Sequence, residues 1–235
     1  AKKCVHDYAA EMICLQLAGT DPDGLNRTAS EAVETVKKVA SAVDVPLIVW
    51  GTGNHDKDTE VLKTVAEAFC DRNLILGPVE EADHKKIGAA AIGCKHTVAA
   101  TTPVDINLAK QLNILLGNLG VPDNSLVMDT SVSSIGYGLE YCYSVMERTR
   151  MAALTQQDTR LQYPIIANLA KEVWKTKEAK LPEKEDPRMG DAGKRGILLE
   201  AMTATLLLMA GADILIMRHP EAMKQVKELI KDLMG

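Results

Sequence analysis

The sequence predicts an α/β protein with a parallel sheet, arranged as a (β/α)8 TIM barrel. Two observations carry this prediction. Short apolar runs alternate with amphipathic helical stretches along the whole chain, and the runs are apolar at consecutive positions. Consecutive apolar positions are typical of parallel strands that helices cover on both faces. Strands that alternate with helices indicate a parallel α/β fold.

Seven apolar runs are the predicted strands. They cover residues 12–19, 46–51, 74–77, 97–102, 126–130, 163–167 and 213–217.

Capping residues and apolar stripes predict helices between these strands. Thr28 and Glu31 have the spacing of a capping box, and Asp58 is expected to cap the helix that follows the second strand. Further helices are expected to begin at Asp105, to cover residues 139–154 and 194–210, and to follow Pro220.

The strand count bears on the architecture. A helix-like segment precedes the first of the seven strands, and a barrel of eight units closes at about 250 residues. We therefore expect one barrel domain over residues 1–235, with its first strand upstream of Ala1. An open doubly wound sheet is the alternative, although its usual Gly-x-Gly-x-x-Gly turn is missing after the first strand.

One segment interrupts the alternation of strand and helix. Fourteen of the 25 residues over 171–195 are charged, and Pro182 and Pro187 fall inside this range. The composition predicts a long solvated loop, which is either functional or a flexible surface insertion.

Composition excludes several classes of function. The net charge is −5 and no basic stripe with interleaved aromatic residues occurs, which argues against a nucleic-acid surface. No apolar run approaches the roughly 18 residues of a transmembrane helix, and the first residues are too polar for a signal peptide. We expect a cytoplasmic protein. The cysteines form no Cys-x-x-Cys pair, so we expect no zinc site or iron–sulfur cluster, only free thiols at Cys4, Cys14, Cys70, Cys94 and Cys142.

The carboxyl ends of the strands form the active face of a parallel barrel. Here they carry mostly small, neutral hydrogen-bonding groups, which suit a large polar ligand with many amides or ring nitrogens. No His, Asp and Glu cluster has metal-ligand spacing, so no metal site is expected. The strand ends are residues 20–21, 51–54, 78–80, 101–103, 129–131, 168 and 218–219.

Several of these residues also have a purely structural interpretation. Asp129 could cap a helix, and His55 is expected to bond to loop backbone. Arg218 and His219 could pair with carboxylates at the rim. The remaining histidines, which lie on helices or at helix ends, are expected to be solvated: His6, His84 and His96.

Four stretches resemble a known family in their order and spacing. They are residues 15–22, 49–56, 100–107 and 128–134, and the segments 190–193 and 217–220 are similar as well. They resemble the small subunit of the corrinoid iron–sulfur protein, the same family as the delta subunit of the acetyl-CoA decarbonylase/synthase complex. The similarity extends over essentially the whole chain.

The resemblance implies a TIM barrel related to pterin-binding methyltransferases, which is not catalytic alone and forms a heterodimer with a larger subunit. That partner carries the iron–sulfur cluster and the corrinoid (cobalamin), and the small subunit's barrel mouth helps to enclose the corrinoid. In the reductive acetyl-CoA pathway the corrinoid takes a methyl group from a methylated tetrahydropterin to acetyl-CoA synthase. A methyltransferase and acetyl-CoA synthase are then transient partners.

By this resemblance, the strand-end residues are candidate contacts of the corrinoid. The alternative is a methyltransferase that binds the methylated pterin itself, in which Asn54, Asp129 and Asn168 would hold the edge of the pterin. The full set of candidate cofactor-binding residues is Thr52, Asn54, Thr101, Thr102, Asp129, Thr130, Ser131 and Asn168. No residue is predicted to be catalytic.

Overall fold

The structure is a computed structural model that describes residues 1–235. The chain forms two compact units. The first unit comprises residues 1–102 and 107–129, and the second comprises 103–106 and 130–235. The single domain over residues 1–235 stays a prediction. None of the helices combines the length and the apolar character that a membrane span requires.

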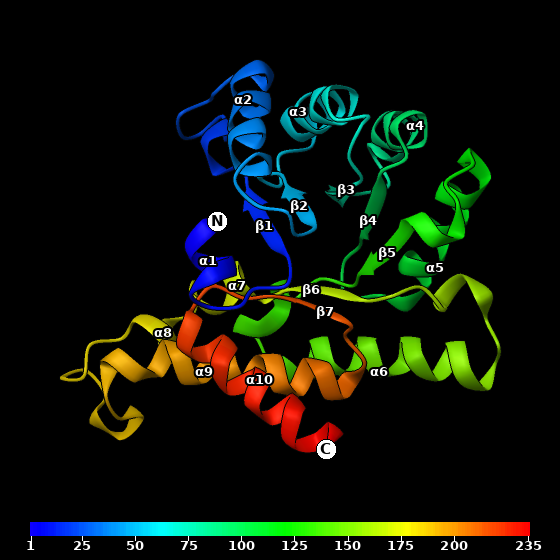
Figure 1. The fold of residues 1–235 in the computed structure, drawn as a ribbon. Helices are drawn as coiled ribbons and strands as arrows, with labels where there is room; N and C mark the ends of the chain where they lie inside the picture. Colours follow the sequence, from blue (N-terminus) through cyan, green and yellow to red (C-terminus); the bar gives the residue numbers. More distant parts are fainter. The chain divides into compact units, whose positions relative to one another are not determined.

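The first unit contains a five-stranded sheet in which every pair of neighbours is parallel (Figure 1). The strands follow one another in chain order, and Ile13, Leu47 and Leu74 lie in register at the start of the first three. The strands are β1 (Ile13–Gln16), β2 (Leu47–Trp50), β3 (Leu74–Val79), β4 (Thr97–Thr101) and β5 (Leu126–Asp129).

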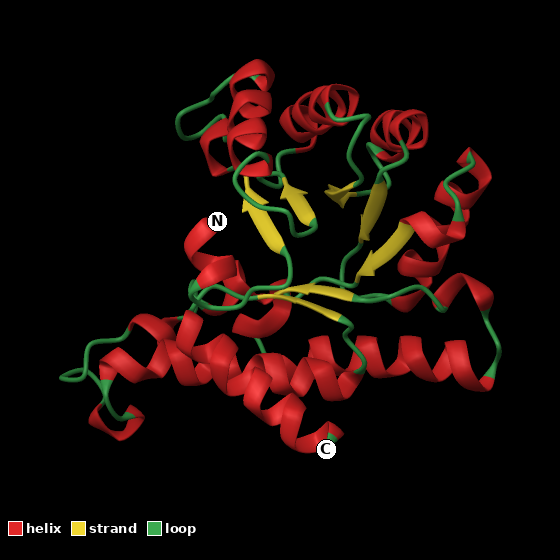
Figure 2. Cartoon of the chain, viewed as in Figure 1, coloured by secondary structure: helices red, strands yellow, loops and turns green.

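A helix follows each of these strands. Neighbouring helices α2, α3 and α4 pack against one another, and Figure 2 shows them outside the strands. Their inward side chains, such as Val36, Leu62 and Ile87, are fully buried, so the core lies between helices and sheet. The helices are α1 (Lys2–His6), α2 (Ala29–Ala40), α3 (His55–Ala68), α4 (His84–Cys94) and α5 (Ile106–Leu119), with short 3-10 turns at Ala18–Thr20 and Asp123–Ser125.

The predicted caps have different outcomes. The capping box is confirmed, since Thr28 accepts a hydrogen bond from the Glu31 amide while the Glu31 carboxylate accepts one from the Thr28 amide. The cap at Asp58 is wrong. Asn54 caps α3 through the Lys57 amide, and Asp58 lies one turn inside the helix with a buried side chain.

The second unit contains a parallel pair of strands, β6 (Ile166–Asn168) and β7 (Ile214–Ile216). Helix α9 packs against α6, α8 and α10 (Figure 1). The helices are α6 (Leu139–Thr155), α7 (Leu169–Val173), α8 (Lys177–Lys180), α9 (Ala192–Ala210) and α10 (Pro220–Met234), with 3-10 turns at Ser133–Gly136, Thr159–Leu161 and Pro187–Met189. All seven predicted strands are therefore confirmed, and the eighth stays a prediction.

The charged segment 171–195 is more ordered than a solvated loop. It contains α8 and a 3-10 turn, and it ends at Arg195, which is buried. The Arg195 guanidinium donates hydrogen bonds at 2.6–3.1 Å to four backbone carbonyl oxygens. One buried side chain thus holds residues 181–190 of this segment in place, through the carbonyls of Leu181, Asp186, Met189 and Gly190.

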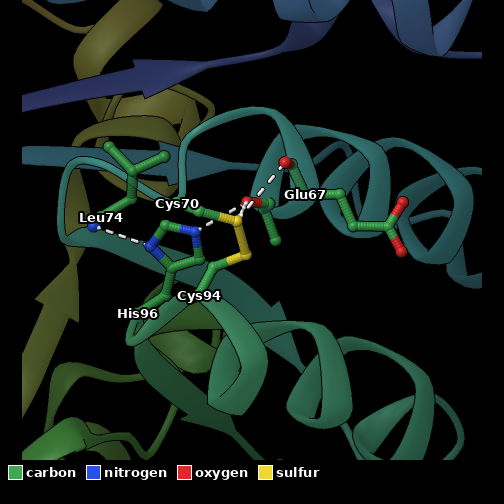
Figure 3. The surroundings of a disulfide bond; sticks show 6 residues. Glu67, Cys70, Leu74, Cys94 and His96 are labelled. Atoms are coloured by element: carbon green, nitrogen blue, oxygen red, sulfur yellow. Dashed lines mark hydrogen bonds between the residues drawn. A yellow bond between two sulfur atoms is a disulfide. The ribbon is translucent and has the colours of Figure 1, made fainter.

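The expectation of free thiols is wrong for Cys70 and Cys94, which form a disulfide (Figure 3). Cys94 is the last residue of α4 and Cys70 lies just beyond α3. Because these helices are packed neighbours, the two Cα atoms come within 4.3 Å of each other. The other three cysteines are free, and burial raises the pKa of Cys14 to about 12.

His96 is also buried, contrary to the expected solvation. Its Nδ1 accepts a hydrogen bond from the Leu74 amide at 3.1 Å, and its Nε2 lies 2.9 Å from the Ala66 carbonyl oxygen, beside the disulfide (Figure 3). The imidazole therefore joins the end of α3 to the start of β3, and burial lowers its pKa. His84 is buried too, with Nδ1 2.6 Å from the Glu81 carbonyl oxygen.

The disulfide generates a stability prediction. A bridge with a sequence separation of 24 restricts the unfolded chain, so Cys70→Ser should lower the free energy of unfolding by about 3 kcal/mol. Urea denaturation without reductant measures this difference. Cys4→Ser, at an exposed free thiol, is the matched control. An equal effect of both substitutions, or a C70S effect that persists in excess dithiothreitol, would contradict the prediction.

Candidate functional site

The five parallel strands of the first unit all end at the same edge of the sheet. The predicted site residues of this unit lie there. Thr52 and Asn54 follow β2, while Thr101 ends β4, Thr102 follows it and Asp129 ends β5. The sheet therefore places these five side chains along one edge, which is the edge where parallel α/β folds bind ligands.

The loop after β2 is held from inside by Asp58. Its carboxylate is 1% exposed and accepts hydrogen bonds from the Thr52 amide at 2.8 Å and the Gly53 amide at 2.7 Å. It also accepts one from the Thr52 hydroxyl at 3.1 Å. A Cβ atom at Gly51 would lie 2.4 Å from this carboxylate, so glycine is required for the approach. Asp58 thus fixes the loop that presents Thr52 and Asn54.

A group of acidic side chains and one histidine lies at the end of β3. His55 Nε2 is 3.6 Å from a Glu80 carboxylate oxygen, and its Nδ1 is 3.9 Å from an Asp83 carboxylate oxygen. His55 is the first residue of α3 and faces carboxylates, so its predicted contact with loop backbone is wrong. Burial raises the pKa of both the Glu80 and the Asp83 carboxyl, and the nearby His55 offsets part of this increase.

Asp129 connects the ends of β4 and β5. Its carboxylate accepts a hydrogen bond from the Thr101 hydroxyl at 3.2 Å, and its backbone carbonyl accepts one from the Thr102 amide at 2.9 Å. Asp129 is 4% exposed. The next α-helix begins only at Leu139, so Asp129 is not a helix cap. The Thr102 hydroxyl is buried and has no hydrogen-bond partner.

Three predicted site residues belong to the second unit. Thr130 is fully buried, and its hydroxyl has no hydrogen-bond partner. Ser131 has φ 59°, and its hydroxyl donates to Ser133 Oγ at 2.8 Å. Asn168 ends β6 and precedes α7, but its side chain makes no capping hydrogen bond. Its amide is half-buried and available to a ligand.

A second buried carboxylate, Glu200 of α9, was not among the predicted site residues. It is fully buried and accepts hydrogen bonds from the indole N–H of Trp174 at 2.8 Å, from the His219 amide at 3.0 Å, and from the Arg218 amide. Glu200 is the only charged residue between positions 196 and 212. That isolated charge in an apolar helix is the sequence signal that could have identified it.

These geometries divide the predicted residues into two groups. The hydroxyls of Thr52 and Thr101 are bonded to buried carboxylates, and those of Thr102 and Thr130 are buried. Asn54, Ser131 and Asn168 are exposed or half-buried, although the Asn54 oxygen caps α3 and the Ser131 hydroxyl donates to Ser133. Among the described residues, no group of three or more His, Cys, Asp or Glu side chains is arranged to hold a metal ion.

The Asp58 contacts predict a large effect of Asp58→Asn. An amide offers one acceptor oxygen, so an N–H that the carboxylate satisfied loses its partner, and the free energy of unfolding should fall by about 1.5–3 kcal/mol. Asp56→Asn, at an exposed position in the first turn of the same helix, should cost less than about 1 kcal/mol. Urea denaturation of both variants is the measurement, and equal losses would refute the role given to Asp58.

The group around His55 predicts a pH dependence. Because folding raises the pKa of Glu80 and Asp83, their contribution to the free energy of unfolding is greatest in acid and falls as pH rises through the raised values. His55→Gln removes a positive charge, so both pKa values should rise further. Carboxyl carbon chemical shifts in a pH titration measure this. The Glu31 pKa, which hydrogen bonds to Thr28 lower, should stay unchanged. Unshifted Glu80 and Asp83 values in H55Q would disprove the contact.

Comparison with known proteins identifies the family of this chain. A family model described as CO dehydrogenase/acetyl-CoA synthase delta subunit matches residues 1–231. The acetyl-CoA decarbonylase/synthase complex subunit delta of Archaeoglobus fulgidus is 38% identical over 240 residues, which cover 100% of this chain and 53% of that protein. The acetyl-CoA decarbonylase/synthase complex subunit delta 2 of Methanosarcina acetivorans is 37% identical, and the match covers 100% of this chain and 55% of that protein. The chain spans about half the length of the curated relatives it matches.

Solved structures show the fold. Dihydropteroate synthase of Thermus thermophilus superposes with a TM-score of 0.63 at 16% identity, covering 100% of this chain and 88% of that one. A complex of the Xanthomonas albilineans enzyme gives 0.63 at 14% identity, over 98% and 83%. These proteins are TIM barrels, which confirms the predicted fold class. From its sequence match, the chain belongs to the family of CO dehydrogenase/acetyl-CoA synthase delta subunits.

Proposed function

We propose that this chain is the barrel portion of a delta subunit of an acetyl-CoA decarbonylase/synthase complex, in which its strand-end edges help to enclose a corrinoid. The corrinoid is carried by a larger partner subunit during methyl transfer from a methylated tetrahydropterin to acetyl-CoA synthase. The family match over residues 1–231 carries the proposal. A methyltransferase and acetyl-CoA synthase would be transient partners.

The chemistry of the strand ends fits a corrinoid. The periphery of a corrin ring carries carboxamide groups, and each of these donates and accepts hydrogen bonds without charge. Asn54 and Asn168 carry carboxamides and Ser131 carries a hydroxyl, which are uncharged groups that can pair with those of the corrin, and all three residues are exposed or half-buried. The carboxylates of Asp58 and Asp129 accept hydrogen bonds from the hydroxyls of Thr52 and Thr101, and both carboxylates are buried. They would therefore hold these threonines in place without bringing their own charge to the ligand.

In this proposal the protein supplies position rather than reacting groups. A bound corrinoid supplies the cobalt centre through which the methyl group is transferred. Within the second unit, Ser131 and Asn168 would bind carboxamides and help to orient the ring, and Asn54 would do the same at the edge of the first unit. The buried network of Thr101 and Asp129 would keep the rim rigid while the ligand is held.

Reconstitution with the larger corrinoid-carrying subunit tests the proposal. We expect a coloured complex that copurifies with this chain, and we expect the chain alone not to transfer methyl groups from methyltetrahydrofolate to free cobalamin. Asn168→Ala removes one uncharged hydrogen bond and should lower corrinoid retention in the complex about two- to tenfold. Asn124→Ala, on the 3-10 turn before β5, is the control and should have no effect.

Two results would contradict the proposal. Methyl transfer by the purified chain without a partner would favour the alternative, a methyltransferase that binds the methylated pterin itself. Failure to form a complex with the larger subunit would remove the basis for enclosure of a shared corrinoid. Asn168→Ala and Asn124→Ala variants that retain the corrinoid equally would show that the predicted edge does not contact it.

A further inference from the structure

Arg218 follows β7 at the carboxyl end of the two-stranded sheet of the second unit. Its side chain is exposed, and its guanidinium lies over the Trp174 ring, 5.4 Å from the ring centre. The guanidinium forms no ion pair and donates no side-chain hydrogen bond to the chain. Arg218 is thus a cation with an aromatic support and with its N–H donors still available.

The surroundings of Arg218 are rigidly organised. The indole N–H of Trp174 donates a hydrogen bond to the buried Glu200 carboxylate. This carboxylate also accepts hydrogen bonds from the backbone amides of Arg218 and His219. The Trp174 ring packs so closely on α9 that a Cβ atom at Gly196 would lie 2.5 Å from it. One buried carboxylate therefore sets both the position of the ring and the course of the loop that carries Arg218.

His219 completes this arrangement. Its ring stacks on Trp174 with 5.9 Å between ring centres and an interplanar angle of 25°. Its Nδ1 accepts a hydrogen bond from the Glu221 amide and so caps α10. The cap occupies that amide of the helix and leaves the N–H groups of the Arg218 guanidinium, and the Nε2 of His219, as donors of this cluster.

A guanidinium placed over an aromatic ring is suited to one class of ligand. Its N–H groups form a planar fork that matches two oxygens of a phosphate or similar oxyanion, and cation–π contact keeps the fork in place without neutralising it. Glu200 is the carboxylate bonded within this cluster, but it is fully buried, and its oxygens are occupied by N–H donors. The charge of Arg218 is therefore left for an external anion.

We propose that Arg218, positioned by Trp174 and Glu200, binds a phosphate-type oxyanion at the carboxyl end of β7. The group could come from a free phosphate ester or from the phosphodiester in the nucleotide loop of a cobalamin. The oxyanion site does not depend on the proposed corrinoid function, because only the second source requires it. Arg218 is a binding residue in this proposal, and Trp174 and Glu200 are positioning residues.

The indole N–H signal of Trp174 in an NMR titration of the full chain tests the site. Trp50→Phe identifies which of the two indole signals belongs to Trp174. Inorganic phosphate at constant ionic strength should shift this signal saturably. Arg218→Gln should weaken the apparent affinity about tenfold or more, because charged hydrogen bonds are lost. Arg188→Gln, at an exposed arginine paired with Asp186, is the control and should bind like the wild type.

A linear, unsaturated response to phosphate, or equal affinities of R218Q and the wild type, would overturn the proposal. A backbone amide spectrum of R218Q as well dispersed as that of the wild type shows that the variant is folded. Parallel titrations with cyanocobalamin and with dicyanocobinamide, which lacks the nucleotide loop, separate the two sources. A shift with cyanocobalamin alone supports its phosphodiester as the source. Equal shifts with both compounds would exclude the cobalamin phosphodiester as the source of the oxyanion. The contacts of the corrin ring in the proposed function would not be affected by that result.

Discussion

Parallel strand pairing is the constraint on which the organisation of this protein depends. It places the carboxyl ends of all strands of a sheet at one edge. The loops that follow these strands must keep a fixed conformation in solvent while the edge stays open to a ligand. Buried carboxylates do this in both units. Asp58 accepts hydrogen bonds from backbone amides of the loop after β2, and Glu200 accepts them from backbone amides of the loop after β7. Because an unpaired buried carboxylate is very costly, each of these contacts strongly favours one loop conformation.

The same arrangement explains the character of the candidate site. Acidic side chains are present at the strand ends, but Asp58, Asp129 and Glu200 are directed into the protein and bonded there. Hydroxyl and amide groups remain exposed or half-buried at the strand ends, together with His55 and Glu80 in the first unit and Arg218 in the second. The family membership and this chemistry support the same functional proposal.

Local sequence patterns predicted most of the fold. The apolar runs located all seven strands, because parallel strands are buried on both faces and need no partner to be recognised. The capping box at Thr28 was equally local. The cap after β2 could not be predicted locally, because Asn54 and Asp58 are both suitable capping residues and lie one turn apart. The bonds of Asp58 to Thr52 and Gly53 decide between them, and those depend on how the loop folds back.

Contacts between distant segments could not be predicted in this way. The disulfide joins residues 24 positions apart, and His96 connects two segments more than 20 positions upstream. Both arise because α3 and α4 are packed side by side. The strand-end residues were correctly placed at the strand ends, but the sequence did not distinguish the inward hydroxyls of Thr102 and Thr130 from the accessible amide of Asn168. That difference is a property of packing.

Threonine methyl NMR of the chain in complex with the corrinoid-loaded larger subunit tests whether the strand ends enclose the corrinoid. Thr52, Thr101, Thr102 and Thr130 lie at strand ends, whereas Thr35 and Thr64 lie on helices α2 and α3. If the strand ends enclose the corrinoid, replacing the corrinoid-free partner with the loaded one should shift the methyl signals of the strand-end threonines and leave Thr35 and Thr64 unchanged. Shifts confined to Thr35 and Thr64, or no shift at any threonine, would contradict it.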